Sequence, residues 1–125
     1  MNLVDSSAWL EYFADGPQAG EFAAAIEDIA NVLVPTVVLV EVARRVMQQR
    51  GENKALQVAA VMHQVRIVEL DSGIALAAAK LGVEHKLPLA DSIILATAGQ
   101  HDATIWTLDA DFKGIAGVRY FARVE

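Results

Sequence analysis

Residues 2–13, NLVDSSAWLEYF, contain the local pattern from which the fold can be predicted. The apolar run at 2–4 predicts a short buried strand, and Asp5 follows it directly. The next residues predict a helix, because aromatic side chains recur there at the i, i+3 and i+4 spacing, namely Trp9, Tyr12 and Phe13. A strand that leads directly into a helix is the repeating unit of α/β proteins.

The same alternation continues along the chain. Further strands are predicted at residues 32–34, 67–70, 104–108 and 118–121. Further helices are predicted at residues 21–30, 36–50, 53–65, 74–86 (with Ser72 as its start) and 90–100. Gly51 is expected to end the helix 36–50 in a left-handed conformation. Short apolar strands between helices predict a mostly parallel sheet covered on both faces, so we expect an α/β fold and one domain over residues 1–125.

Composition excludes several classes of protein. Hydrophobic residues make up 54% of the 125 residues, which is too many for a disordered chain. The longest stretch without an acidic or basic residue covers only 12 residues, 29–40, whereas a membrane-spanning helix needs about 20. The sequence contains no cysteine, so disulfides, thiolate zinc sites and a cysteine nucleophile are excluded. Because no secretion signal is recognisable at its start, we expect the chain in the cytoplasm.

Five acidic residues occupy unusual positions. Asp5 and Asp109 come directly after predicted strands, and Asp111 follows two residues later. Glu41 and Asp91 stand inside very apolar helical segments. Because the strands of a parallel sheet end at the same edge, these five side chains can converge on one site there.

Each of these acids also has a purely structural interpretation. Asp5 and Asp109 are well placed to cap the elements that follow them, and Asp91 can interact with a helix dipole. Glu41 has arginines three and four positions later, where an exposed ion pair contributes only about 0.2–0.5 kcal/mol. That contribution is small beside the several kcal/mol that burial of an unpaired carboxylate costs.

A cluster of these acids favours a hard cation. Like charges within a few Å repel one another and raise each other's pKa unless a cation lies between them. Oxygen ligands without cysteine or a paired histidine select Mg²⁺ or Mn²⁺, and either ion can polarise a phosphodiester and lower the pKa of an attacking water. The net charge of −6 argues against bulk attraction of a polyanion, but without these five acids only 11 acids would face 10 bases.

Other common catalytic motifs are missing. The three histidines, His63, His85 and His101, lack the i, i+4 spacing of a helical two-histidine metal site. No G-x-S-x-G segment, P-loop or dinucleotide-binding glycine pattern occurs. The order of residues does not exclude a Ser–His–Asp triad, but nothing in the sequence favours one.

Four short motifs occur in a characteristic order. They are Val4-Asp5-Ser6-Ser7-Ala8; Pro35-Thr36-Val37 with Glu41; Leu87-Pro88-Leu89-Ala90-Asp91-Ser92 with Ala96-Thr97-Ala98; and Thr107-Leu108-Asp109-Ala110-Asp111-Phe112. In this order and at this spacing they resemble the motifs of PIN-domain ribonucleases and, more narrowly, of the VapC toxins of bacterial VapBC toxin–antitoxin systems. The resemblance covers essentially the whole chain.

The resemblance implies a three-layer α/β/α PIN-like domain with a short, mostly parallel sheet of about five strands. It also implies Mg²⁺- or Mn²⁺-dependent endonucleolytic cleavage of an RNA (tRNA, rRNA or mRNA) by metal-activated water. The positions that match the family's metal-binding acids are Asp5, Glu41, Asp91 and Asp109. Ser6 and Thr107 match its supporting hydroxyls, and Asp111 matches a position that is often acidic but less uniformly a ligand.

The resemblance implies partners as well. VapC toxins generally form homodimers, which can enter larger toxin–antitoxin assemblies. A small VapB-like antitoxin holds each toxin inactive, with its C-terminal segment lying along an apolar groove that reaches the acidic pocket. We expect no membrane association.

Several alternatives remain open from the residues themselves. The acidic pocket can instead bind an arginine or lysine of a partner without catalysis. A phosphoacceptor role for Asp5 is disfavoured, because no second aspartate or D-x-D-x-T string accompanies it. Arg44 and Arg45 either contact RNA phosphates or form a solvated face of their helix. The aromatic residues of helix 6–13 either line a partner groove or belong to the core.

Overall fold

A parallel β-sheet forms the centre of the structure. The computed structural model describes residues 1–124, in which five strands and six α-helices follow one another. The strands are β1 (Asn2–Val4), β2 (Val32–Pro35), β3 (Arg66–Val68), β4 (Thr104–Thr107) and β5 (Val118–Tyr120). The helices are α1 (Ser6–Phe13), α2 (Ala19–Ile26), α3 (Thr36–Arg50), α4 (Glu52–Met62), α5 (Ser72–His85) and α6 (Leu89–Gln100). Two short 3₁₀ turns are η1 (Ile29–Asn31) and η2 (Ala110–Phe112).

All neighbouring strands of the sheet run parallel, in the order β3-β2-β1-β4-β5. The carboxyl ends of the strands therefore lie at one edge. The chain places β2 and β3 on one side of β1, and it places β4 and β5 on the other side. Ligand sites of open α/β sheets form where the strand order reverses in this way. In this chain that point lies between β1 and β4, which Asp5 and Asp109 follow.

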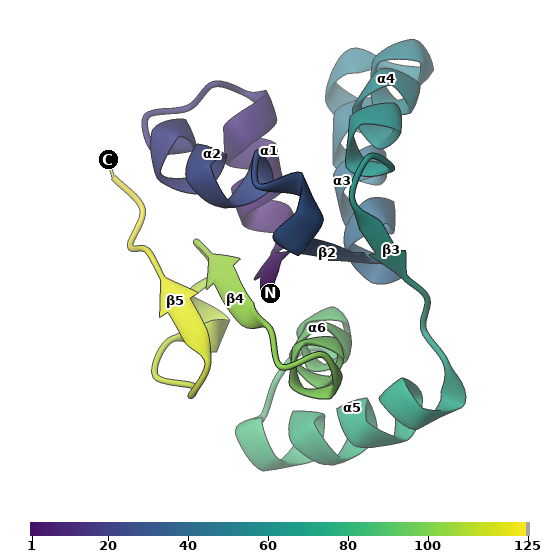
Figure 1. The fold of residues 1–125 in the computed structure, drawn as a ribbon, viewed down its shortest axis with the longest axis vertical. Coiled ribbons are helices and arrows are strands. Elements are labelled where there is room, and N and C mark those ends of the chain that lie inside the picture. The colour runs from purple at the N-terminus through teal and green to yellow at the C-terminus, as the bar shows by residue number, and fades with distance from the viewer. Residues whose placement is uncertain (125) are drawn as a thin grey trace.

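Helices cover both faces of the sheet. Figure 1 shows α5 and α6 together on one side of the strands and α1 to α4 on the other. The alternation of side chains along β2 matches these layers, since Val32 and Val34 belong to the larger core cluster while Leu33 packs with Ile74 and Ala78 of α5. The expected three-layer α/β/α arrangement with five strands is confirmed.

The aromatic residues of α1 face the protein interior. Trp9 is fully buried, and its ring stacks on Phe13 with a centroid distance of 5.6 Å. Tyr12 meets Trp9 edge-on at 6.4 Å. These side chains therefore pack against the core, which favours the structural interpretation of the stripe over a partner groove.

Helix α3 covers Thr36–Arg50 as predicted, although its first half is rich in β-branched residues that favour strands. Its buried residues Val38, Val42 and Val46 recur every four positions, so burial of one helical face outweighs strand propensity. Gly51 has φ 85° and ψ 173°, so the left-handed helical cap that we expected is wrong. The residue instead turns the chain directly into α4, and glycine adopts this positive φ without steric strain.

Several predicted boundaries are wrong by a few residues. The helix predicted at 21–30 covers Ala19–Ile26, and η1 follows it. Asp28, just before that turn, has φ −83° and ψ 67°, which lies outside the helical region, so the helix does not continue through it. Other shifts are smaller: α4 ends at Met62, β3 ends at Val68 and α6 begins at Leu89. Within residues 1–124, no helix combines the length and the apolar character needed to cross a lipid bilayer.

Candidate active site

A pocket opens at the edge of the sheet where β1 and β4 end. Its volume is about 510 Å³. The acids that the sequence predicted as metal ligands all line it, although they come from four different elements. Asp5 follows β1, Glu41 lies on α3, Asp91 lies in the first turn of α6 and Asp109 follows β4. Ser6, the first residue of α1, lines the pocket beside them.

Asp5 is the most deeply buried of these acids, with 2% of its surface exposed. Its Oδ2 accepts hydrogen bonds from Ser7 Oγ (2.9 Å) and Thr107 Oγ1 (2.7 Å), whereas Oδ1 is approached by Ser6 Oγ at 3.4 Å. Burial raises the pKa of Asp5, and these hydrogen bonds oppose the rise. Asp5 stands at the N-cap position of α1, but its side chain makes no capping hydrogen bond.

The hydroxyls that hold Asp5 are themselves tied to the end of β4. Ser7 Oγ accepts the backbone N–H of Leu108 (3.0 Å), and Thr107 Oγ1 accepts the backbone N–H of Asp109 (2.9 Å). Each hydroxyl thus joins the ends of β1 and β4 while it donates to the carboxylate. Thr107, which the resemblance matched to a supporting hydroxyl, makes the shorter of the two hydrogen bonds to Asp5 Oδ2. We did not predict the role of Ser7. The sequence alone does not indicate which of two adjacent serines faces Asp5, because this depends on the direction in which α1 leaves β1.

Glu41 is partly buried on α3 and makes no ion pair with Arg44 or Arg45. Its Oε1 is a buried atom with no hydrogen-bond partner among the described residues. The one ion pair found within residues 1–124 lies on α5. Burial and the negative charge of Asp5 raise the pKa of Glu41, and the nearby Ser6 side chain opposes the rise. A buried carboxylate oxygen without a partner is unfavourable unless a proton or a cation binds to it.

Asp91, Asp109 and Asp111 form a tight group of acids. One carboxylate oxygen of each lies within 4.8 Å of those of the other two. Burial and the charge of Asp109 raise the pKa of Asp91 to about 8. Asp109 also accepts the backbone N–H of Asp111 (2.9 Å), so it does cap η2. The sequence suggested Asp111 only as a supporting residue. Its carboxylate lies near enough to the other two to bind the same metal ion.

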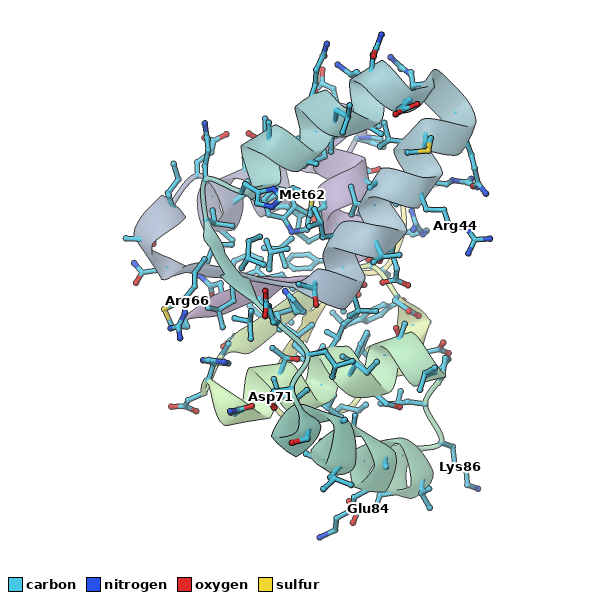
Figure 2. All side chains as sticks on the ribbon, turned by 90° about the vertical axis from the view of Figure 1, so that its right-hand side faces the viewer. Arg44, Met62, Arg66, Asp71, Glu84 and Lys86 are labelled. Carbon is cyan, nitrogen blue, oxygen red and sulfur yellow. The ribbon has the colours of Figure 1, made fainter. Side chains whose placement is uncertain are left out.

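Arg44 and Arg45 are not brought into the pocket. Both are exposed on α3, and Figure 2 shows Arg44 on the outer surface of that helix. The unpredicted residues that line the pocket include two from the C-terminal segment, Tyr120 at the end of β5 and Arg123 beyond it. No local pattern marks either residue, because the pairing of β5 with β4 is what carries this segment to the site.

Sequence comparison identifies the family to which this geometry belongs. A family model described as the PIN domain matches residues 3–118. The chain belongs to the PIN domain family. The resemblance found in the four motifs is thereby confirmed at the level of the family. No curated protein matches this PIN domain significantly.

Solved structures similar to this PIN domain include a toxin–antitoxin complex and a toxin. A chain of a toxin–antitoxin complex from Klebsiella pneumoniae has 26% sequence identity and a TM-score of 0.79, with 95% of this chain and 96% of that chain covered. FitAcB from Neisseria gonorrhoeae has 24% identity and a TM-score of 0.70, with 98% and 97% covered. VapC20 from Mycobacterium tuberculosis, described as a toxin that cleaves the sarcin–ricin loop, has 19% identity and a TM-score of 0.76, with 93% and 95% covered. For the last two, the similarity shows the fold alone.

Proposed function

We propose that this PIN domain is a divalent-metal-dependent endoribonuclease and the toxin of a type II toxin–antitoxin pair. The observation that carries the proposal is the convergence of four acids on one pocket at the carboxyl ends of the strands, namely Asp5, Glu41, Asp91 and Asp109. Asp111 adds a fifth carboxylate beside two of them.

The residues present fit a hard divalent cation. All candidate ligands are carboxylate oxygens, which Mg²⁺ and Mn²⁺ prefer. Glu41 Oε1 is buried without a partner, and three other carboxylates have oxygens within 4.8 Å of one another. Burial and mutual repulsion raise the pKa of Asp5, Glu41 and Asp91, so a cation would relieve an unfavourable arrangement. When bound, such an ion polarises a phosphodiester and lowers the pKa of the attacking water.

The side chains of the pocket have different tasks under this proposal. Hydrogen bonds from Ser7 and Thr107 fix Asp5 Oδ2, which leaves Oδ1 to bind the cation together with Asp91 and Asp109. Glu41 Oε1 accepts no hydrogen bond from the described residues, so this oxygen is available to help hold the cation and to accept a proton from the attacking water. The raised pKa of Glu41 suits that role, because it makes this carboxylate a better proton acceptor than an ordinary one.

Removal of the metal tests the proposed activity. The purified chain, free of any antitoxin, is incubated with total bacterial RNA and Mg²⁺ or Mn²⁺, and new RNA ends are mapped by sequencing. We expect discrete new ends with either ion, none in a chelator, and their return when the ion is added back. A folded chain that binds Mn²⁺ but cuts no RNA would favour the alternative, in which the acidic pocket captures a basic segment of a partner.

The solved neighbours support an antitoxin partner. The Klebsiella pneumoniae structure is a toxin–antitoxin complex, and VapBC2 from Rickettsia felis was solved with a DNA fragment from its promoter. We therefore propose a small VapB-like antitoxin for this chain and, with it, a larger toxin–antitoxin assembly in the cytoplasm.

The predicted homodimer has a candidate contact surface on α5 and α6. Val83 and Leu89 are 81% and 80% exposed, and they line an apolar hollow of about 590 Å³ between the two helices. Clustered aliphatic side chains on a surface mark interaction sites, so a second copy of this chain can pack against this face.

A further inference from the structure

The wall of the acidic pocket contains one basic side chain among the described residues, and it comes from the end of the chain. Arg123 lines the pocket together with Asp5, Glu41, Asp91 and Asp109. The preceding strand, β5, pairs with β4 in a register that places Tyr120 opposite Thr107, and Phe121 N–H continues this ladder by donating to Thr107 C=O (2.9 Å). The chain therefore leaves the sheet at the same edge as the acids.

Gln18 fixes the backbone on both sides of Arg123. This glutamine lies in the turn before α2 and is only 6% exposed. Its Nε2 donates to the backbone carbonyl of Ala122 (2.8 Å), and its Oε1 accepts the backbone N–H of Val124 (3.1 Å). Both polar ends of a buried side chain are thus used to hold one residue in place. Such preorganisation lowers the entropy that a later contact must overcome.

The guanidinium of Arg123 makes no ion pair with the pocket acids within residues 1–124. Its side chain is exposed, so an anion that enters the pocket can reach it. An anionic substrate that approaches five carboxylates is repelled by them, and a cation bound among them offsets only part of that charge. A planar guanidinium at the rim offers paired N–H donors that match the oxygens of a phosphate. Arg44 and Arg45 do not line the pocket, so neither stands beside the acids as Arg123 does.

We propose that Arg123 binds a phosphate of the RNA beside the acidic cluster, and that Gln18 is the positioning residue that holds it there. The proposal rests on the nuclease function above and adds to it a substrate contact outside the metal ligands. Arg123 touches the substrate, whereas Gln18 acts only through the backbone on either side of Arg123.

Binding of RNA tests this proposal separately from cleavage. The probe is a fluorescein-labelled single-stranded RNA of mixed sequence and about 12 nucleotides. The chain is titrated into this RNA in the presence of Ca²⁺, and binding is followed by fluorescence anisotropy. We expect Arg123→Gln to weaken binding about tenfold and to reduce the slope of log affinity against log salt by about 0.7, the loss of one phosphate contact. Arg66→Gln is the matched control, since Arg66 is exposed at the start of β3, away from the carboxyl ends of the strands. Figure 2 shows Arg66 on the opposite side of the molecule from Arg44, which lies on α3, the helix that carries Glu41 of the pocket.

A double-mutant cycle separates positioning by Gln18 from a general structural role. We expect Gln18→Ala to weaken RNA binding in the native chain but to have no further effect in the Arg123→Gln background, because Gln18 acts through Arg123. In cleavage assays with Mg²⁺, both variants should raise KM more than they lower kcat. Additive effects on RNA binding would show that Gln18 does not act through Arg123.

The outcomes of the two assays are distinguishable. If Arg123→Gln binds the RNA as tightly as the native chain, or if Arg66→Gln loses as much affinity, the proposal for Arg123 is wrong. It is also wrong if Arg123→Gln lowers only the melting temperature, or if the native chain does not bind the probe. Binding that depends on Arg123 without any RNA cleavage would contradict the nuclease function and leave the anion contact supported.

Discussion

Asp5→Asn is expected to lower RNA cleavage at least about a hundredfold while the chain stays folded. An asparagine at this position can keep the two strongest hydrogen bonds, because its carbonyl oxygen can accept from Ser7 and Thr107 as Asp5 Oδ2 does. Its amide group then replaces Oδ1 and presents N–H donors where the cation needs an acceptor. The rate of RNA cleavage in Mg²⁺ measures the effect, and circular dichroism checks that the fold is retained.

Asp15→Asn provides the matched control for this variant. Asp15 is exposed just beyond the far end of α1, and its φ of 51° is one that asparagine tolerates. The same change of charge there should leave cleavage unchanged. An Asp5→Asn chain that cleaves RNA at the native rate would contradict a role for Asp5 in binding the metal.

Asp91→Asn is expected to raise the melting temperature of the metal-free chain by at least about 4 °C near pH 8. The pKa of Asp91 is raised to about 8 by burial and by the charge of Asp109, so folding favours its protonated form. The stability that this proton contributes is complete below the unfolded-state pKa near 4 and is lost as the pH rises toward 8. Asparagine is neutral throughout, so the advantage of the variant should grow across this range.

Melting curves in a chelator at about pH 5 and about pH 8.5 measure this trend. Asp15→Asn is again the matched control, because Asp15 is exposed and does not line the acidic pocket. At saturating Mn²⁺ the order should reverse, since the ion stabilises the native chain more than a variant that has lost a ligand. A variant that melts at or below the native temperature in chelator at every pH would show that Asp91 is not under repulsion in a cluster.

The sequence predicts the acids of this pocket better than it predicts their surroundings. Asp5 and Asp109 could be predicted because a parallel sheet brings its carboxyl ends together whatever the details of packing. Glu41 could be predicted because a carboxylate among valines needs a reason stronger than an exposed ion pair, and the structure indeed leaves its Oε1 without a partner. These inferences depend only on topology and on the cost of burying a charge.

The remaining features depend on contacts between segments far apart in the chain. Ser7, rather than Ser6, makes the shorter hydrogen bond to Asp5, and this depends on how α1 leaves β1. Arg123 reaches the pocket through the pairing of β5 with β4 and through bonds from Gln18, about 100 residues away in sequence. Neither interaction has a local signature, so a single sequence could not indicate it.

The central claim is that acids from separate elements hold one divalent cation. The most direct test is to titrate the metal-free chain with Mn²⁺ and to measure the concentration of free Mn²⁺ by electron paramagnetic resonance. We predict saturable binding to the native chain and to Asp15→Asn, and an affinity at least about tenfold weaker for both Glu41→Gln and Asp91→Asn. Equal affinity in all four proteins, or no saturable binding in the native chain, would contradict the claim.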